Sequence, residues 1–301
     1  MKPAPFAYHA PASVAEATQL LAELGDEAKV LAGGQSLIPM LALRLAVFDH
    51  LLDIGRIPEL KGIDRRDHDV GAADPASRTG VWIGAGATEA AVEASAEVRS
   101  AVPLLAKATT FVGHVQIRNR GTLGGSIAHA DPAAEYPAVA LALDARLEVV
   151  STQGHRTIEA RDFFDGLWST TMEPHELLTG VWFPTWSGRT GFAVEELARR
   201  HGDFAVAGAA VGVQLDGDDR IQRCGIGLIG LGSTPERARA AEAELVGRPV
   251  TDIEPDEVGR LAMIGLDSIP ADLHGSAEYR RRVGAVMVGR AWAAAVMEAQ
   301  A

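Results

Sequence analysis

The chain has 301 residues, 47% of them hydrophobic and 23% charged, so it can bury a sizeable core and divide into two or three units. Its formal net charge is −12 and no run of Lys and Arg forms a basic stripe, which argues against nucleic acid or an anionic membrane as a partner. The N-terminus lacks the apolar core of a signal peptide, and no window approaches the ~20 apolar residues of a membrane span, so we expect a cytoplasmic protein.

The single cysteine, Cys224, limits the redox chemistry that this chain can carry by itself. One thiol cannot form an internal disulfide, and it falls short of the set of thiolates that usually holds an iron–sulfur cluster. Its neighbours form a strand-like run, so we expect a small buried side chain. Any cluster or metal centre is therefore expected on another chain.

The first unit, residues 1–60, has a βαβ-like pattern. Ser13 followed by Glu16 forms a capping box at the start of an apolar helical pattern. Apolar runs and helical spacing then alternate, which predicts helices over 14–24 and 37–45 and strands over 29–32 and 51–54.

The second unit, residues 61–173, begins with a polar stretch rich in turn residues, 64–77, which predicts a hairpin loop or a surface excursion. The remainder mixes strand and helix patterns. It predicts a strand over 81–87, helices over 102–112 and 133–143, and a hairpin formed by 146–151 and 156–160.

The third unit, residues 174–301, changes character. Four strand candidates separated by Gly and Asp turns are followed by three amphipathic helices, which favours an antiparallel sheet with helices on one face. The predicted strands cover 177–183, 191–197, 204–215 and 221–229, and the predicted helices cover 235–245, 255–266 and 277–297.

Two pairs of adjacent glycines are the most informative local features. Gly33 and Gly34 follow a predicted strand, and Gly124 and Gly125 follow the polar run 118–121. Adjacent glycines lack Cβ atoms, so their backbone N–H groups can approach an anion and form a concave donor nest. Each pair alone is more often just a tight turn, and neither matches the Rossmann or P-loop pattern. Together they predict two loops that hold one pyrophosphate.

Polar groups beside these glycines support the same interpretation. Ser36 and Thr122 each offer a hydroxyl donor, and a helix beginning near Leu37 would point the positive end of its dipole at a phosphate. His129 and Asp131 resemble a metal-ligand pair, but no third ligand stands at suitable spacing, so a place in the cofactor pocket is the better interpretation.

Three segments resemble the medium, FAD-binding subunit of the carbon monoxide dehydrogenase and xanthine dehydrogenase family of molybdenum hydroxylases. They are KVLAGGQSLIP at 29–39, QIRNRGTLGGSIAHADPAAE at 116–135 and RRHGDFA at 199–205. Their order and spacing and the chain length all fit. The resemblance implies an α+β fold: a two-part PCMH-type (vanillyl-alcohol-oxidase-like) FAD-binding domain, then an α+β C-terminal domain with an antiparallel sheet and helices.

The resemblance also implies which residues hold non-covalent FAD. In that family both loops hold the FAD diphosphate, and an acidic residue at the position of Glu135 contacts the cofactor. The eukaryotic xanthine enzymes have Asp there, and they have a lysine near the flavin where this chain reads Val194-Glu195-Glu196. The implied cofactor-binding residues are Lys29, Val30, Ala32, Gly33, Gly34, Gln35, Ser36, Leu37, Thr122, Gly124, Gly125, Ser126, His129, Asp131 and Glu135, with no catalytic residue and no metal ligand.

The implied function is electron transfer within a larger complex. A large subunit would carry the molybdenum cofactor and a small subunit the 2Fe-2S clusters, with FAD on this chain passing electrons to an external acceptor such as a quinone or NAD. The assembly would be a dimer of heterotrimers. A carbon monoxide dehydrogenase-like complex is the closest-looking member, although purines, N-heterocycles and aldehydes are also substrates in the family. A self-sufficient PCMH-fold flavin oxidoreductase and a non-redox module for a phosphate ligand are the alternatives.

Overall fold

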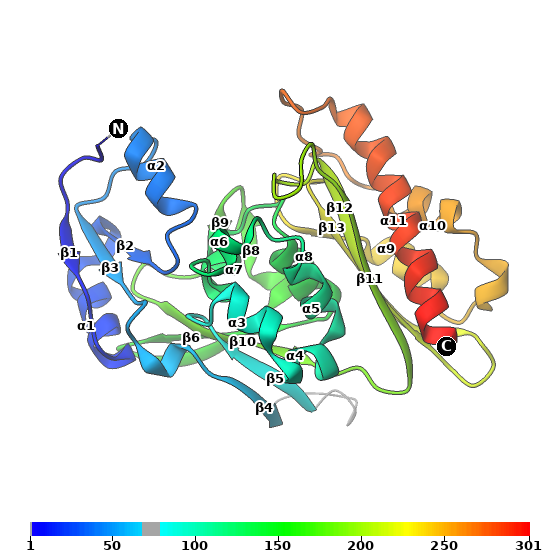
Figure 1. The fold of residues 1–301 in the computed structure, drawn as a ribbon, viewed down its shortest axis with the longest axis horizontal. Helices are drawn as coiled ribbons and strands as arrows, with labels where there is room; N and C mark the ends of the chain where they lie inside the picture. The colour runs from blue at the N-terminus through cyan, green and yellow to red at the C-terminus, as the bar shows by residue number, and fades with distance from the viewer. Residues whose placement is uncertain (1, 68–78) are drawn as a thin grey trace.

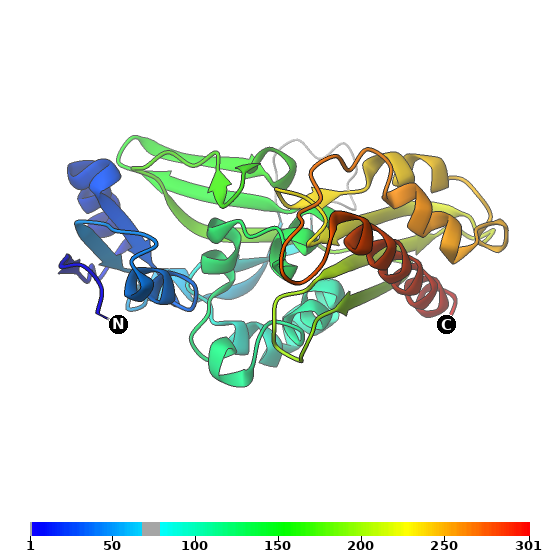
Figure 2. The same ribbon diagram turned by 90° about the horizontal axis from the view of Figure 1, so that it is seen from above.

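The computed structural model describes residues 2–67 and 79–301 of the chain. Three units follow one another along the long axis of the molecule, with the N-terminal unit at one end and the C-terminal helices at the other (Figure 1). The view from above shows the same order, with the middle unit in contact with both others (Figure 2). Most of the loop predicted over 64–77 lies outside the described residues.

The first unit contains the predicted βαβ arrangement. Strands β2 and β3 are parallel neighbours, and β1 pairs with the other edge of β3. Helix α1 has the predicted bounds because the capping residues act as expected: the N–H of Glu16 donates to Ser13 Oγ over 3.2 Å. The elements are β1 (Ala7–His9), α1 (Val14–Leu24), β2 (Ala28–Leu31), α2 (Leu37–Leu43) and β3 (His50–Asp53).

The second unit is built on a five-stranded antiparallel sheet in the order β4-β5-β10-β6-β7. Its elements are β4 (Ile63–Asp67), β5 (Thr79–Gly84), α3 (Glu89–Ala94), α4 (Ala96–Ala101), α5 (Pro103–Thr109), α6 (Val115–Arg118), α7 (Leu123–His129), α8 (Glu135–Ala142), β6 (Arg146–Ser151), β7 (Gly154–Glu159), β8 (Phe164–Gly166), β9 (Ser169–Thr170) and β10 (Leu177–Pro184).

Two strands of this sheet differ from the sequence prediction. Residues 63–67 form an edge strand, although 64–67 were predicted as loop, because pairing with β5 outweighs their polar composition. Strand β10 was predicted as the first strand of the third unit, but it is the centre of this sheet, between β5 and β6. All of its residues are buried, and an apolar strand does not show in its sequence which neighbours it will pair with.

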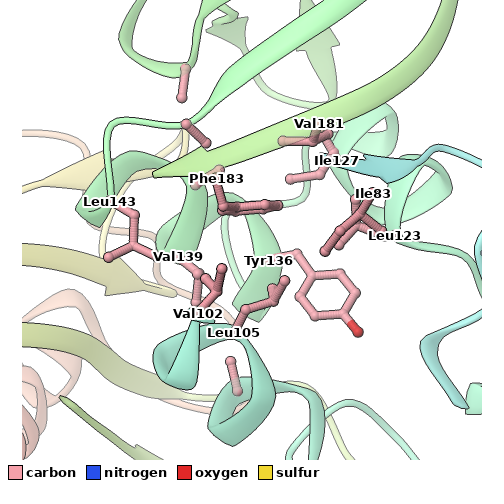
Figure 3. Packing of buried hydrophobic residues seen from close by; sticks show 14 of the residues in the cluster. Ile83, Val102, Leu105, Leu123, Ile127, Tyr136, Val139, Leu143, Val181 and Phe183 are labelled. Carbon is pink, nitrogen blue, oxygen red and sulfur yellow. The ribbon is translucent and has the colours of Figure 1, made fainter. Parts of the chain in front are cut away.

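The main core lies between this sheet and the helices that cover it (Figure 3). Ile83, Val181 and Phe183 project from the sheet toward the helices and are fully buried. Tyr136 on α8 is also fully buried, and its hydroxyl lies 3.1 Å from Thr109 Oγ1 on α5, so its polar atom has a partner in the core. The core thereby fixes the start of α8, which carries Glu135.

The third unit is an antiparallel sheet with helices on one face, as predicted. Its fourth strand, however, is the short β14 (Glu236–Arg237), from the start of the predicted helix 235–245, in place of 177–183. Its elements are β11 (Arg189–Leu197), β12 (Ala207–Leu215), β13 (Ile221–Ile229), β14 (Glu236–Arg237), α9 (Arg239–Leu245), α10 (Pro255–Ala262) and α11 (Ala277–Gln300). The predicted Cys224 environment is confirmed, since the thiol is buried on β13. In the part of the chain that the structure describes, no helix combines the length and apolar character needed to cross a bilayer.

The opposite face of this sheet packs on α8 of the second unit. A Cβ atom at Gly227 would overlap the carbonyl oxygen of Ala138, and one at Gly225 would overlap that of Ala142. These glycines of β13 therefore let the backbone of α8 lie directly on the sheet. The contact brings β11, with Glu196, close to the residues at the start of α8.

Candidate cofactor site

A cavity of about 650 Å³ lies where the three units meet. Of the residues predicted to bind the cofactor, all line this cavity except Gly33. They come from β2 and the loop after it, from α7 and from the start of α8. The fold therefore brings together segments that are about 90 residues apart in the sequence, at a site within the ~300–1,000 Å³ typical of ligand pockets.

The first glycine loop supplies backbone donors. Gly34 has a φ of +74°, a conformation that favours glycine, and it turns the chain from β2 into α2. Within the described residues, the N–H groups of 33–36 donate to no acceptor of the chain. A hydrogen bond within the loop stabilises its conformation: Gln35 Nε2 donates to the carbonyl oxygen of Gly33 over 3.0 Å. These free amides, with Lys29 nearby in the same cavity wall, suit an anionic group.

The second glycine segment is different, because it forms the first turn of α7. Thr122 caps this helix, and its Oγ1 accepts the N–H of Gly125 over 3.0 Å. The N–H of Gly124 donates to Ala85 O and that of Ser126 to Thr122 O, each over 3.0 Å. The amides of this turn are already used inside the chain, so the structure does not show the free donor nest expected at this segment.

The glycines of the second segment instead allow close packing. A Cβ at Gly124 would overlap Ala85 at the end of β5, and one at Gly125 would lie 3.3 Å from the Cβ of Ala32. From the other side, a Cβ at Gly33 would overlap the carbonyl oxygen of Arg120. The two glycine segments therefore abut, and Gly33 has its role in this contact and not in the lining of the cavity.

Two buried carboxyl groups with raised pKa values, those of Glu89 and Glu135, also form part of the cavity wall. Burial raises the pKa of Glu135 to about 8, with nearby Glu196 adding to the effect. Burial likewise raises the pKa of Glu89 to about 7, against the opposing charge of Arg118. A carboxyl that keeps its proton near neutral pH does not repel an anionic ligand. Nothing in the sequence pointed to Glu89, which looks like an ordinary acidic residue in the first turn of a helix.

His129 lies in the wall beside an aromatic residue that the sequence did not indicate. The rings of His129 and Trp168 are stacked, with centroids 6.2 Å apart and planes 8° apart. Burial lowers the pKa of His129, which favours the neutral imidazole. Trp168 has a φ of +56°, which is strained for a bulky residue, and its side chain is 55% exposed while lining the cavity.

Asp131 has a structural task as well as a place in the cavity wall. Its Oδ1 accepts the N–H of Ala133 over 2.8 Å, which shapes the turn between α7 and α8. Among the described residues, no group of three His, Cys, Asp or Glu side chains is arranged to hold a metal ion.

The turn between β11 and β12 closes another side of the cavity through Gly202, Asp203 and Phe204. Gly202 has a φ of +85°, and a Cβ there would overlap the ring of His114. Phe204 is 65% exposed at this edge. The segment 199–205, one of the three that carry the family resemblance, was the signal in the sequence for these residues.

The residues present fit FAD. Free amides and a lysine can hold its diphosphate, and apolar and aromatic side chains can cover its rings. In addition, Glu89 Oε2 is buried without a hydrogen-bond partner among the described residues, although Glu89 lines the cavity. A buried polar atom without a partner is costly, so a ligand that supplies one fits this position.

Comparisons with known proteins agree with the geometry. Residues 4–186 match the FAD binding domain in molybdopterin dehydrogenase, and residues 192–295 match the CO dehydrogenase flavoprotein C-terminal domain. The chain is 39% identical to the 6-hydroxypseudooxynicotine dehydrogenase complex subunit alpha of Paenarthrobacter nicotinovorans, covering 100% of this chain and 97% of that one. It is also 39% identical to the carbon monoxide dehydrogenase medium chain of Hydrogenophaga pseudoflava, covering 98% of both.

A solved structure shows the same architecture. The carbon monoxide dehydrogenase from Hydrogenophaga pseudoflava, in a form that lacks the Mo-pyranopterin moiety of the molybdenum cofactor, superposes with a TM-score of 0.90 at 40% sequence identity. The match covers 99% of each chain.

Proposed function

Because this chain belongs to the family of FAD-binding medium subunits of molybdenum hydroxylases, we propose that it holds FAD between the 2Fe-2S clusters of a small subunit and an external electron acceptor. It is an oxidoreductase subunit with a FAD-binding domain followed by a flavoprotein C-terminal domain. The substrate would be oxidised at the molybdenum cofactor of a large subunit, and the external acceptor would be a quinone, NAD or another oxidant.

The observation that carries this proposal is the convergence of the predicted cofactor residues on one cavity between the three units. FAD, when bound, supplies the electron-transfer chemistry. The residues of this chain have three tasks: the amides of 34–36 bind the diphosphate, Trp168 and His129 orient the cofactor, and the neutral carboxyls of Glu89 and Glu135 complete the wall.

The substrate is a property of the partner subunit in this proposal. Two relatives share 39% identity with this chain, and their names refer to different substrates, 6-hydroxypseudooxynicotine and carbon monoxide. We propose a carbon monoxide dehydrogenase-like complex, which the TM-score of 0.90 with a carbon monoxide dehydrogenase chain supports. We further propose that the complex assembles as a dimer of heterotrimers. A cytoplasmic location completes the proposal, since an unpaired thiol such as buried Cys224 is the ordinary state there.

Anaerobic reduction of the assembled complex tests the electron-transfer role. The chain is co-expressed with its large and small subunits, and candidate substrates, including carbon monoxide, are added while the visible flavin absorbance is followed. We expect bleaching only when all three subunits are present. Rapid bleaching of the isolated chain by an organic substrate would instead show a self-sufficient flavoenzyme.

Size and composition measurements provide the second arm of the test. The co-expressed complex should sediment as a dimer of heterotrimers, and omission of the small subunit should abolish bleaching while FAD stays bound to this chain. A chain that purifies without FAD, and does not bind FAD when it is added, would contradict the proposal.

A further inference from the structure

The cavity is strongly acidic for a site that takes an anionic cofactor. Among the described lining residues, Lys29 is the only Lys or Arg side chain, whereas the acidic ones are Asp26, Glu89, Asp131, Glu135, Glu173, Glu176 and Asp203. Glu176 is neutralised from outside the cavity, where Arg156 Nε donates to it over 2.6 Å. The buried carboxyls of Glu89 and Glu135 would repel the diphosphate if they were ionised, so their charge must be removed by another means, such as protonation.

Glu89 is held in place by direct contact with the second glycine segment. Its N–H donates to the carbonyl oxygen of Gly121 over 2.9 Å, and a Cβ at Gly121 would lie only 2.6 Å from the carboxyl carbon of Glu89. The residue is 4% exposed, it lines the cavity, and its Oε2 has no hydrogen-bond partner among the described residues. The carboxyl is thus fixed and buried, with one oxygen free.

The groups around Glu89 do not neutralise it by pairing. The positive charge of Arg118 lowers the pKa of Glu89, but the Arg118 guanidinium is bound to Glu93, with Nε 2.8 Å from Oε2. On the α8 side lie Glu135, which carries a raised pKa itself, and the buried hydroxyl of Tyr136. Glu196 of β11 and Asp131 act on Glu135 electrostatically, and both raise its pKa. Burial raises the pKa of Glu89 to about 7, so its neutral form is accessible under ordinary conditions.

We propose that Glu89 is a cofactor-positioning residue that binds FAD as a neutral carboxylic acid, donating its O–H to an acceptor atom of the cofactor, so that FAD binding is coupled to uptake of a proton. This role rests on FAD being the ligand of the cavity. A protonated carboxyl is both donor and acceptor, so it satisfies the free Oε2 and removes a negative charge from the wall in one step.

The coupling has a definite sign. Since bound FAD favours the protonated form of Glu89, affinity is greatest below the pKa of about 7 in the free protein and falls as the pH rises above it. The limiting slope from one group is about tenfold per pH unit. Glu135 contributes in the same direction at about pH 8, so the effect of Glu89 must be isolated by substitution.

The experiment is calorimetric titration of the flavin-free full chain with FAD, in buffers of different ionisation enthalpy at pH 6.0, 7.5 and 8.5. Wild type is compared with Glu89→Gln, which keeps the shape and offers a permanent N–H donor. Glu97→Gln on α4 is the matched control, since that exposed carboxylate pairs with Arg65 away from the cavity. Urea unfolding of each flavin-free variant shows whether it is folded.

We expect wild type to take up protons at pH 7.5 and Glu89→Gln to take up about half to three-quarters of a proton fewer. At pH 6.0 the two should bind FAD within about threefold, and at pH 8.5 Glu89→Gln should bind about ten- to thirtyfold more tightly. Glu97→Gln should behave as wild type does.

The outcomes separate this inference from the proposed function. Equal proton uptake by wild type and folded Glu89→Gln overturns the role of Glu89, while FAD binding itself stands. If Glu89→Gln does not fold, Glu135→Gln decides, because it removes the other contributing carboxyl. Proton uptake by this variant at pH 7.5 supports the role of Glu89, and its absence overturns the coupling. Absence of FAD binding at every pH would instead contradict the proposed function.

Discussion

Gly33 lies directly against the carbonyl group of Arg120, so closely that a Cβ atom at Gly33 would overlap that oxygen. The contact joins the loop after β2, in the first unit, to the residues before α7, in the second. The first segment supplies free amides, and the second, whose amides are already hydrogen-bonded, forms the adjoining wall of the cavity. The shape of the cavity therefore depends on the close contact between the two backbones.

Substitution of Gly33 by Ala should therefore separate the two segments and weaken FAD binding. Overpacking a close contact costs about 1–3 kcal/mol, so we expect FAD affinity to fall by roughly tenfold or more. Flavin content after purification and titration with FAD measure the effect. Gly217→Ala is the control, since a Cβ there meets no atom within 4 Å. A folded Gly33→Ala variant with wild-type affinity would show that this approach is dispensable.

Removal of the Trp168 ring should loosen the cofactor without unfolding the chain. Trp168 lines the cavity and stacks on His129, and its side chain is 55% exposed. An aromatic contact contributes about 0.5–1.5 kcal/mol, so Trp168→Ala should weaken FAD binding by roughly two- to tenfold, and Trp168→Phe should recover most of it. Flavin fluorescence titration measures this. Leu167→Ala, exposed and adjacent, should bind as wild type does; an equal loss in both Ala variants would contradict a role of the ring.

Glu196 should make the flavin-free chain less stable as the pH rises. Burial raises the pKa of Glu196 to about 7 from its ordinary value near 4.5, and its Oε2 is buried without a partner among the described residues. The neutral carboxyl therefore favours the folded state, fully below about pH 4.5, and that contribution is lost as the pH rises through 7. The slope from this group is on the order of 1 kcal/mol per pH unit, reduced by its partial exposure.

Urea unfolding at pH 5, 6, 7 and 8 measures this slope. Glu196→Gln should flatten the decline of the unfolding free energy relative to wild type, whereas Glu278→Gln, an exposed carboxylate on α11, should leave the slope unchanged. A wild-type free energy of unfolding that rises with pH over this range would mean that Glu196 is ionised and paired in the folded chain, and not neutral.

Loss of Arg237 should weaken the attachment of the third unit to the second. Its buried guanidinium donates to Glu242 from Nε over 2.8 Å and, from Nη1, to Asp144 over 2.5 Å and to the Leu141 carbonyl over 2.6 Å. Removing one partner of a buried ion pair costs about 3–5 kcal/mol, so Arg237→Ala should lower the free energy of unfolding by that amount in urea. Arg282→Ala breaks only an exposed pair with Glu278, and we expect a change below about 0.5 kcal/mol. Similar losses in both variants would contradict the special role of Arg237.

Local signals in the sequence were sufficient for much of the fold. The capping residues Ser13 and Glu16 placed α1 at its observed bounds, and alternation with turn residues placed β13 over 221–229. These predictions succeed because hydrogen bonds and periodicity within a few residues decide them. The glycine pairs and the family resemblance likewise located segments that line the cavity, and the match of both family models confirms the FAD-binding family.

Tertiary structure decided what depends on contacts between distant segments. Strand β10 joined the sheet of the second unit because its partners, β5 and β6, lie far from it in sequence, and its apolar residues fit any buried strand. The amides at Gly124 and Gly125 proved to be satisfied by Ala85 and Thr122, which no count of glycines reveals. The raised pKa of Glu89 is caused by burial, and Glu89 is buried only when the chain folds and brings Gly121 against its carboxyl group. The sequence alone therefore indicated an ordinary ionised carboxylate, whereas in the folded chain this carboxyl is readily neutral.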